Sequence, residues 1–253
     1  MTDIPELSFF ITRKINNMND NLLWIECIRQ IRLFYNNEPI YIIDDDNNID
    51  NIIKLDTIVD IPKHNIHLLN TNDDLHIKGS GSLASFYYYH KLKSSKRAIF
   101  LKDDLFILKP FDEDTIKNSD IRLLFGFIDK HETYKSLVNS LVLNLNYGQK
   151  ILEYKYNYNW VGCLNNSCLI SLDYILYLDN HYNFFINLHF INNKLLSKVF
   201  ERLLGLLITY DKKNLTNISL LGFNCQYNND LNKYIYHKNE LINDNIPYYH
   251  LNR

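Results

Sequence analysis

The run AIFLKDD, residues 98–104, decides how this chain folds: four apolar residues lead into a lysine and two carboxylates. A short, unbroken apolar run predicts a strand that is buried on both faces, as parallel strands are. In open, mostly parallel sheets the ligand crevice lies beyond the carboxyl ends of the strands. We therefore expect Asp103 and Asp104 at a binding edge, although a solvated turn would also place aspartates there.

Two similar runs come earlier in the chain, LSFFI at residues 7–11 and IYII at residues 40–43. Between them, residues 21–35 carry apolar side chains at spacings of three and four, which predicts a helix with one buried stripe. Strand, helix and strand form a parallel unit, so the residues after each strand should reach the same edge. Asp44 and Asp45 are such residues, and they could bind a ribose or base or could cap the strand end.

Adjacent carboxylates suit a hard divalent cation, because Mg²⁺ and Mn²⁺ prefer oxygen ligands and offset neighbouring negative charges. An ion on Asp103 and Asp104 could bridge the phosphates of a nucleotide. The sequence GSGS, residues 79–82, leads into a predicted helix, whose free N–H groups could receive a diphosphate. Gly79 and Gly81 are therefore candidate ligands, and a plain flexible loop is the alternative.

The rest of the chain predicts one α/β domain. We expect further strands at residues 66–69 and 121–127, and helices at residues 83–92, 134–145, 172–178 and 195–208. The 253 residues contain no Pro, Gly or Ser-rich linker, so a single domain spanning residues 1–253 is expected.

Charge and hydropathy argue against two classes of protein. The formal net charge is -2 at pH 7 and the pI is near 6.5, which provides no basic stripe for a nucleic acid. No apolar run approaches the roughly 18 residues of a membrane span, and the acidic N-terminus is unlike a signal peptide. We therefore expect no nucleic-acid partner, no membrane span and a cytoplasmic location.

The order of these elements resembles the nucleotide-sugar half of GT-A glycosyltransferases. The resemblance is carried by FIT at residues 10–12, IIDD at residues 42–45 and IFLKDDLF at residues 99–106. It implies a single GT-A domain: a Rossmann-like α/β fold with a mixed, mostly parallel sheet flanked by helices. Residues 1–110 would bind the nucleotide sugar and residues 111–253 the acceptor. The chain also looks similar to glycosyltransferase-like proteins of large DNA viruses, which would place it in the host cytoplasm or the virion.

The resemblance implies roles for the strand-end residues. In the family, the acidic residue near Asp44 or Asp45 contacts the nucleoside. A DxD-type motif, here Asp103-Asp104, holds Mn²⁺ or Mg²⁺ on the diphosphate. Lys102 stands where the first Asp of a strict DxD motif would be.

Three more residues are candidates on the donor side. Thr12 and Arg13 follow the first predicted strand directly, and Arg13 could contact the diphosphate there. His250 lies in the C-terminal tail, where GT-A enzymes often bring in an additional metal or phosphate ligand. An isolated exposed histidine is the alternative interpretation.

The second half contains the sequence WVGC around Trp160 and the sequence FERLL around Glu201, both similar to the acceptor half of these enzymes. By this resemblance Trp160 and Gly162 would shape the acceptor pocket. Glu201 would be the catalytic base that takes the proton of the acceptor hydroxyl. Trp160 could instead be a core aromatic residue, and Glu201, which lies off the centre of its predicted helix stripe, could simply pair with Lys198.

Together these features predict a metal-dependent glycosyltransferase that moves a sugar from a nucleoside-diphosphate sugar, most simply a UDP-sugar, to a glycan or protein acceptor. A degenerate domain of the same fold that binds a nucleotide or glycan is the first alternative, and Lys102 favours it. A nucleotidyltransferase is the second, because it also uses paired carboxylates and a metal.

Overall fold

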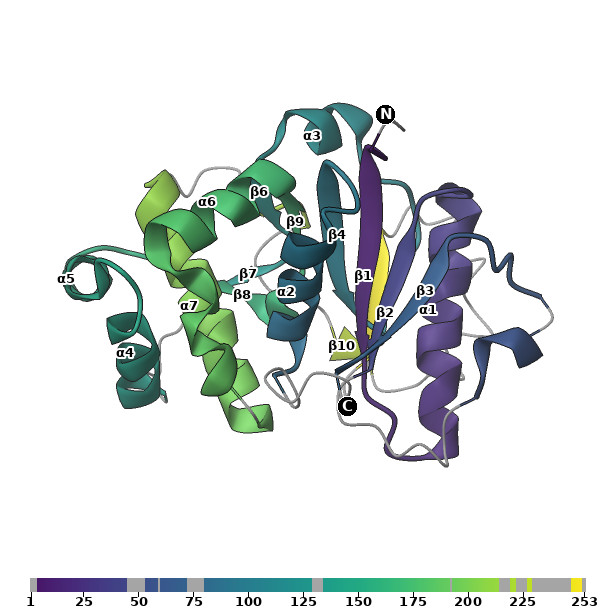
Figure 1. The fold of residues 1–253 in the computed structure, drawn as a ribbon, viewed down its shortest axis with the longest axis horizontal. Coiled ribbons are helices and arrows are strands. Elements are labelled where there is room, and N and C mark those ends of the chain that lie inside the picture. Colours follow the sequence, from purple (N-terminus) through teal and green to yellow (C-terminus); the bar gives the residue numbers. More distant parts are fainter. Residues whose placement is uncertain are drawn as a thin grey trace.

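The computed structural model describes residues 4–44, 53–58, 60–71, 80–128, 134–191, 193–213, 219–221, 227–228 and 247–251. Its centre is a six-stranded sheet with the strand order β3-β2-β1-β4-β9-β6 (Figure 1). The strands, in that order, are β3 (Ile66–Asn70), β2 (Ile40–Asp44), β1 (Leu7–Arg13), β4 (Arg97–Lys102), β9 (Cys168–Ser171) and β6 (Ile121–Leu123). Strands β1 to β4 are mutually parallel, and β9 runs antiparallel to both of its neighbours. The predicted mixed, mostly parallel sheet is confirmed.

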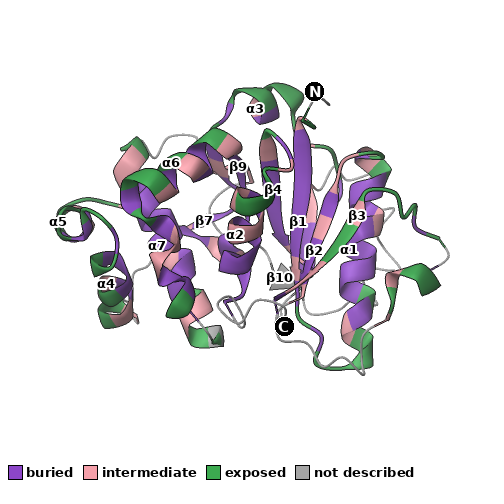
Figure 2. Cartoon of the chain, in the orientation of Figure 1, coloured by how far each residue is buried: buried purple, intermediate pink, exposed green. Residues whose placement is uncertain are grey.

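Helices cover both faces of this sheet, because its central strands are apolar on both sides. Phe9 and Ile11 pack with α1 (Asn21–Phe34) in one core, whereas Phe10 and Phe100 face a second, larger core. The second core contains α2 (Ser82–Leu92), α6 (Leu172–Tyr182) and α7 (Lys194–Lys212), with α4 (Lys135–Leu143) and α5 (Gly148–Asn157) beyond them (Figure 1). Figure 2 shows the central strands β1 and β4 buried and the edge strand β3 partly exposed.

Smaller elements complete the domain. A three-stranded sheet has the order β10-β11-β5, and a two-stranded sheet joins β7 and β8. Their bounds are β5 (Leu105–Ile107), β10 (Tyr227–Asn228), β11 (Tyr248–Leu251), β7 (Gly126–Phe127) and β8 (Gly162–Cys163). The short helices are α3 (Glu113–Asn118) and the 3₁₀ helices η1 (Met18–Asp20), η3 (Leu55–Thr57), η5 (Leu164–Asn166) and η6 (Phe184–His189).

One expectation about the second half was wrong, and one helix was not predicted. The single strand expected at residues 121–127 is two strands, because the chain bends at Leu124 and its N–H bonds the carbonyl of Ser167. Strand β6 then pairs with β9, and β7 with β8. Helix α5 lies in a Tyr-rich segment for which no helix was predicted, because aromatic residues favour helices only weakly.

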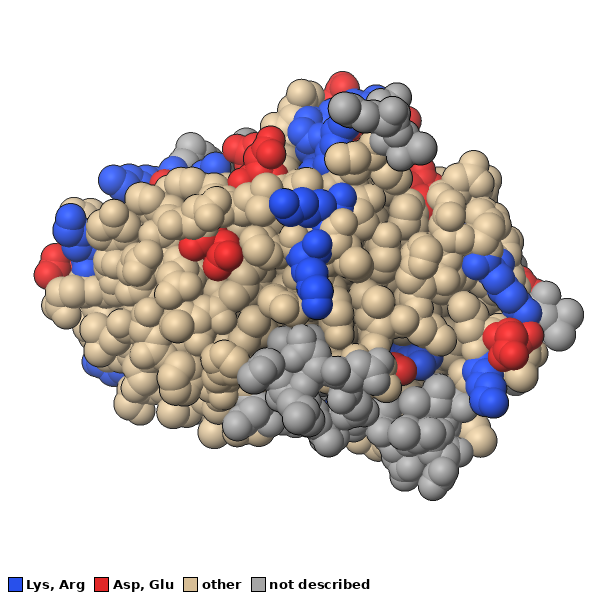
Figure 3. All heavy atoms as spheres, in the orientation of Figure 1, with Lys and Arg blue, Asp and Glu red and all other residues tan. Residues whose placement is uncertain are grey.

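In the part of the chain that the structure describes, every helix is too short or too polar to be a candidate membrane span. On the face of the molecule seen in Figure 3, Lys and Arg side chains are interspersed with Asp and Glu and form no continuous stripe.

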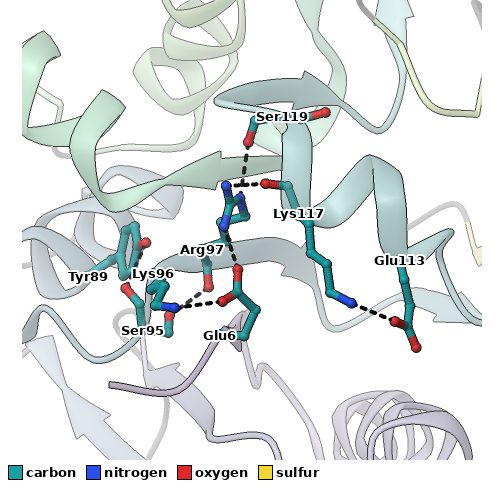
Figure 4. A network of polar contacts seen from close by, with 8 residues as sticks. All are labelled: Glu6, Tyr89, Ser95, Lys96, Arg97, Glu113, Lys117 and Ser119. Atoms are coloured by element: carbon teal, nitrogen blue, oxygen red, sulfur yellow. Dashed lines mark hydrogen bonds and ion pairs between the residues drawn. The ribbon is translucent and has the colours of Figure 1, made fainter. Parts of the chain in front are cut away.

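A polar network fastens the amino-terminal edge of the sheet, opposite to the predicted binding edge (Figure 4). Arg97, the first residue of β4, pairs with the carboxylate of Glu6 and donates to the carbonyls of Lys117 and Ser119 at the end of α3. The Lys96 ammonium lies 3.1 Å from the other Glu6 oxygen. One guanidinium therefore joins the start of β1, the start of β4 and the end of α3.

We expect Arg97→Ala to lower the free energy of unfolding by about 2 kcal/mol, because it breaks several charge-assisted hydrogen bonds in a partly buried position. Urea denaturation measures the change. The matched control is Arg29→Ala, whose ion pair with Asp60 is exposed and should contribute under about 1 kcal/mol. Equal effects of the two substitutions would contradict a structural role for the Arg97 network.

Candidate active site

The carboxyl ends of β1, β2 and β4 bring the predicted donor-side residues to one edge of the sheet. The strand register sets Arg13 opposite Asp44 and Thr12 opposite Lys102. The N–H of Asp103 continues this pairing by bonding the carbonyl of Thr12 at 3.2 Å. Regular parallel pairing thus assembles the edge predicted from the apolar runs.

Arg13 and Asp44 form a bidentate ion pair at this edge. Both nitrogens on one side of the guanidinium bond the two Asp44 oxygens, the Nη2–Oδ2 bond at 2.9 Å. The Arg13 side chain is buried, with its guanidinium carbon 4.5 Å from the centre of the Trp24 ring. A bidentate ion pair whose guanidinium also stacks on an aromatic ring holds the carboxylate in one orientation. The geometry therefore favours Arg13 as the residue that orients Asp44.

Helix α2 begins at the same edge. Gly81 precedes it with φ 58° and ψ -131°, a backbone conformation that side-chain-bearing residues avoid, and glycine allows the chain to turn into the helix there. In the first turns of α2, the Ser85 hydroxyl bonds the Thr12 hydroxyl at 2.6 Å, which joins the helix to the end of β1. Gly79 and Asp45, the other two predicted ligands here, lie outside the described residues.

Asp103 and Asp104 occupy the turn between β4 and β5, and both are buried. Oδ2 of Asp103 accepts the backbone N–H of Lys14 at 3.3 Å. Oδ1 of Asp104 lies 3.4 Å from Nε2 of His250, which is also buried. The cause is strand pairing, because β11 sets His250 directly opposite Leu105, the residue after Asp104. The C-terminal histidine is thus not the isolated exposed residue of the alternative interpretation.

Two of the three predicted metal ligands converge. The 3.4 Å between Asp104 Oδ1 and His250 Nε2 is close to the roughly 3 Å that separates neighbouring ligands when each is about 2.1 Å from an octahedral ion. Among the described residues, no group of three or more His, Cys, Asp or Glu side chains is close enough to hold a metal. Asp104 and His250 thus offer one carboxylate oxygen and one imidazole nitrogen at a spacing that a divalent cation such as Mn²⁺ could bridge. The Asp103 oxygen that bonds Lys14 lies outside this pair.

Glu201 lies on α7 and is buried rather than exposed beside Lys198. Its carboxylate accepts the backbone N–H of Asn165 in η5. Burial raises the pKa of Glu201 from the ordinary 4.5 to about 6, against the opposing effects of Lys102, Arg202, the Asn165 N–H and Lys198. A carboxyl group with a pKa near 6 is suited to accept a proton at neutral pH.

A close backbone contact explains why Glu201 is buried. Gly205 follows it by one turn of α7, and a Cβ there would lie 2.2 Å from the carbonyl oxygen of Val161 and 2.5 Å from the Cα of Gly162. One further turn along, the Thr209 hydroxyl accepts the N–H of Val161 at 3.4 Å. Positions 201, 205 and 209 share one helix face, which lies against the backbone of residues 161–165.

Gly162 and Trp160, the two predicted acceptor-pocket residues, both pack against apolar parts of the protein. A Cβ on Gly162 would lie 2.1 Å from the ring of Phe127, so this glycine makes room for an aromatic side chain as well as for α7. Trp160 is partly buried and packs against the larger core, in keeping with the core-aromatic interpretation. Their predicted contact with an acceptor stays a prediction.

Sequence reasoning missed Asn165, which joins the two halves of the site. Its φ is 56°, a left-handed conformation that asparagine tolerates better than most residues. Its backbone N–H bonds Glu201, and its side-chain amide lies 3.1 Å from Nε2 of His250. The Asn-Asn pair at 165–166 before an apolar strand is a turn signal that could have drawn attention to it. Asp104, His250, Asn165 and Glu201 form one continuous polar chain.

No family model matches this chain, and no curated protein matches it. Solved structures with a similar fold include the mannosyltransferase Ktr4p from S. cerevisiae, at 13% identity and a TM-score of 0.43. The alignment covers 81% of this chain and 65% of the Ktr4p chain. An active-site mutant of LgtC has 11% identity and a TM-score of 0.44, and the alignment covers 96% of this chain and 86% of the LgtC chain. A third is glucosyl-3-phosphoglycerate synthase from Mycobacterium tuberculosis, in complex with Mn²⁺, UDP and glucosyl-3-phosphoglycerate. It has 12% identity and a TM-score of 0.44, and the alignment covers 93% of this chain and 77% of the synthase chain.

The chain thus spans slightly less than two thirds of the length of Ktr4p. At these identities and TM-scores the likeness is one of general architecture.

Glu201→Gln should change stability in a pH-dependent way. The folded protein favours protonated Glu201, so the wild type loses stability as pH rises from about 4.5 through 6, whereas glutamine does not ionise. Relative to the wild type, the variant should gain roughly 2 kcal/mol between pH 4 and pH 7.5. Urea denaturation at the two pH values tests this, and a difference that does not change with pH would contradict the buried environment of Glu201.

The Gly205→Ala substitution tests the contact of α7 with residues 161–165, because the sign of its effect on the free energy of unfolding depends on that contact. At an open helix position alanine stabilises by about 1 kcal/mol relative to glycine. Here the new Cβ meets a backbone carbonyl, so we expect destabilisation by about 1–3 kcal/mol in chemical denaturation. A stabilised variant would show that α7 does not lie against residues 161–165.

Proposed function

We propose that this chain is a metal-dependent glycosyltransferase that moves a sugar from a nucleoside-diphosphate sugar to an acceptor hydroxyl. The observation that carries the proposal is the polar chain from Asp104 through His250 and Asn165 to Glu201. It connects a pair of donors suited to a divalent cation with a buried carboxyl group of raised pKa. A metal-dependent, inverting transfer from a diphosphate leaving group to a hydroxyl uses both.

The donor side of the reaction belongs to the carboxyl edge of β1, β2 and β4. Asp44, oriented by Arg13, would accept hydrogen bonds from the nucleoside. Asp104 and His250 would hold Mn²⁺ or Mg²⁺, which supplies positive charge to the departing diphosphate. The start of α2 after Gly81 offers N–H groups to the phosphates. A UDP-sugar is the expected donor.

The acceptor side belongs to α7 and η5. Glu201 takes the proton of the attacking acceptor hydroxyl, and the Asn165 N–H holds one of its carboxylate oxygens in place. The positive charge of Lys102 acts on Glu201 and lowers its pKa, which limits the effect of burial. Lys102, at the end of β4, thereby keeps the base ionised near neutral pH. A glycan or a protein side chain is the expected acceptor.

A degenerate domain that binds a nucleotide or glycan without catalysis is the second candidate. The observation that favours it is the position of Asp103, whose carboxylate bonds Lys14 and does not complete a three-residue His and Asp cluster among the described residues. This candidate and the transferase make different predictions for product release.

The proposal is tested with a panel of nucleoside-diphosphate sugars and the wild type, Asp104→Asn and Glu201→Gln. We expect donor binding to depend on Mn²⁺ and to be lost in Asp104→Asn, because the cation joins protein and diphosphate. Glu201→Gln should keep donor binding and lose about 100-fold or more in nucleoside diphosphate release. Calorimetry measures the first quantity, and a coupled assay measures the second.

The exposed substitution Asp60→Asn is the matched control and should change neither quantity. Metal-dependent binding of nucleotides without release of nucleoside diphosphate from any donor would favour the degenerate domain. Release of pyrophosphate in its place would indicate a nucleotidyltransferase.

A further inference from the structure

Asn165 holds a position between the proposed cation ligands and the proposed base. It belongs to η5, which packs between the end of β4 and helix α7. Its side-chain amide nitrogen Nδ2 lies 3.1 Å from Nε2 of His250, and His250 Nε2 lies 3.4 Å from Oδ1 of Asp104. Three polar side chains from three distant parts of the chain therefore converge on one small region.

The spacing of these atoms matches a shared cation. Neighbouring ligands of an octahedral ion with bonds of about 2.1 Å lie roughly 3 Å apart. Both separations from His250 Nε2 are of this size. Amide oxygens are ordinary ligands for hard cations. The oxygen and nitrogen ends of an asparagine amide have nearly the same shape, so a half-turn of the group presents its oxygen to the same point.

The backbone of Asn165 accounts for its two separate contacts. With φ 56° and ψ 15°, the residue directs its N–H to the carboxylate of Glu201 while its side chain reaches His250. Asparagine and glycine adopt this conformation at little cost, whereas most other residues do not. A glycine substitution can therefore remove the side chain and keep the backbone contact.

We propose that the side-chain amide oxygen of Asn165 is a third protein ligand of the divalent cation held by Asp104 and His250. This proposal rests on the proposed function, which supplies the cation. It adds a neutral oxygen donor to one carboxylate and one imidazole, a mixture that suits Mn²⁺. Asn165 in η5 would then bind the cation through its side chain while its backbone N–H holds the carboxylate of Glu201.

The experiment measures the affinity of the full chain for Mn²⁺ alone, by electron paramagnetic resonance of the free ion. We expect Asn165→Gly to bind Mn²⁺ about tenfold more weakly or worse than the wild type. Asn165→Asp keeps an oxygen in the same place and adds charge, so it should bind at least as tightly as the wild type. The control is Asn183→Gly, the same change at another left-handed residue, in the C-cap of α6, and it should have no effect.

The outcomes separate this inference from the function on which it rests. If Asn165→Gly binds Mn²⁺ as tightly as the wild type while Asp104→Asn loses it, Asn165 is not a ligand and the metal-dependent transferase stands. If Asn165→Asp binds as weakly as Asn165→Gly, the amide acts only by positioning His250, and the inference is overturned. If the wild type binds no Mn²⁺, both the inference and the metal dependence fall.

Discussion

The contact of Gly205 with the backbone of Val161 and Gly162 is the constraint on which the site depends. It brings α7 onto residues 161–165 more closely than any side chain would allow. One turn earlier on the same helix face, Glu201 is consequently pressed against η5, where it loses contact with water and gains the Asn165 N–H. This close packing contributes to the burial that raises the pKa of the proposed base.

The other half of the site follows from strand pairing. Parallel register brings Arg13 to Asp44 and Thr12 to Lys102, and the short antiparallel pair of β5 and β11 brings His250 to Asp104. Asn165 then connects this edge with α7. Strand pairing and a tight turn account for these contacts, which connect the proposed cation ligands with the proposed base in one polar chain.

The sequence predicted those parts that depend on local pattern. Unbroken apolar runs that end in carboxylates revealed the parallel strands, and the rule for open sheets placed Asp44, Asp103 and Asp104 at one edge. It could not predict contacts between distant segments. The burial of Glu201 depends on Gly205 meeting another part of the backbone, so a helix stripe counted from side chains alone left it at the margin. The partnership of His250 with Asp104 depends likewise on the pairing of β5 with β11.

The most direct test is a crystal structure of the chain soaked with Mn²⁺ and a nucleoside diphosphate, with the metal located by its anomalous scattering. We expect a manganese peak within about 2.2 Å of both Asp104 Oδ1 and His250 Nε2, with the diphosphate beside the start of α2. A manganese peak remote from this pair, or none at saturating Mn²⁺, would contradict it.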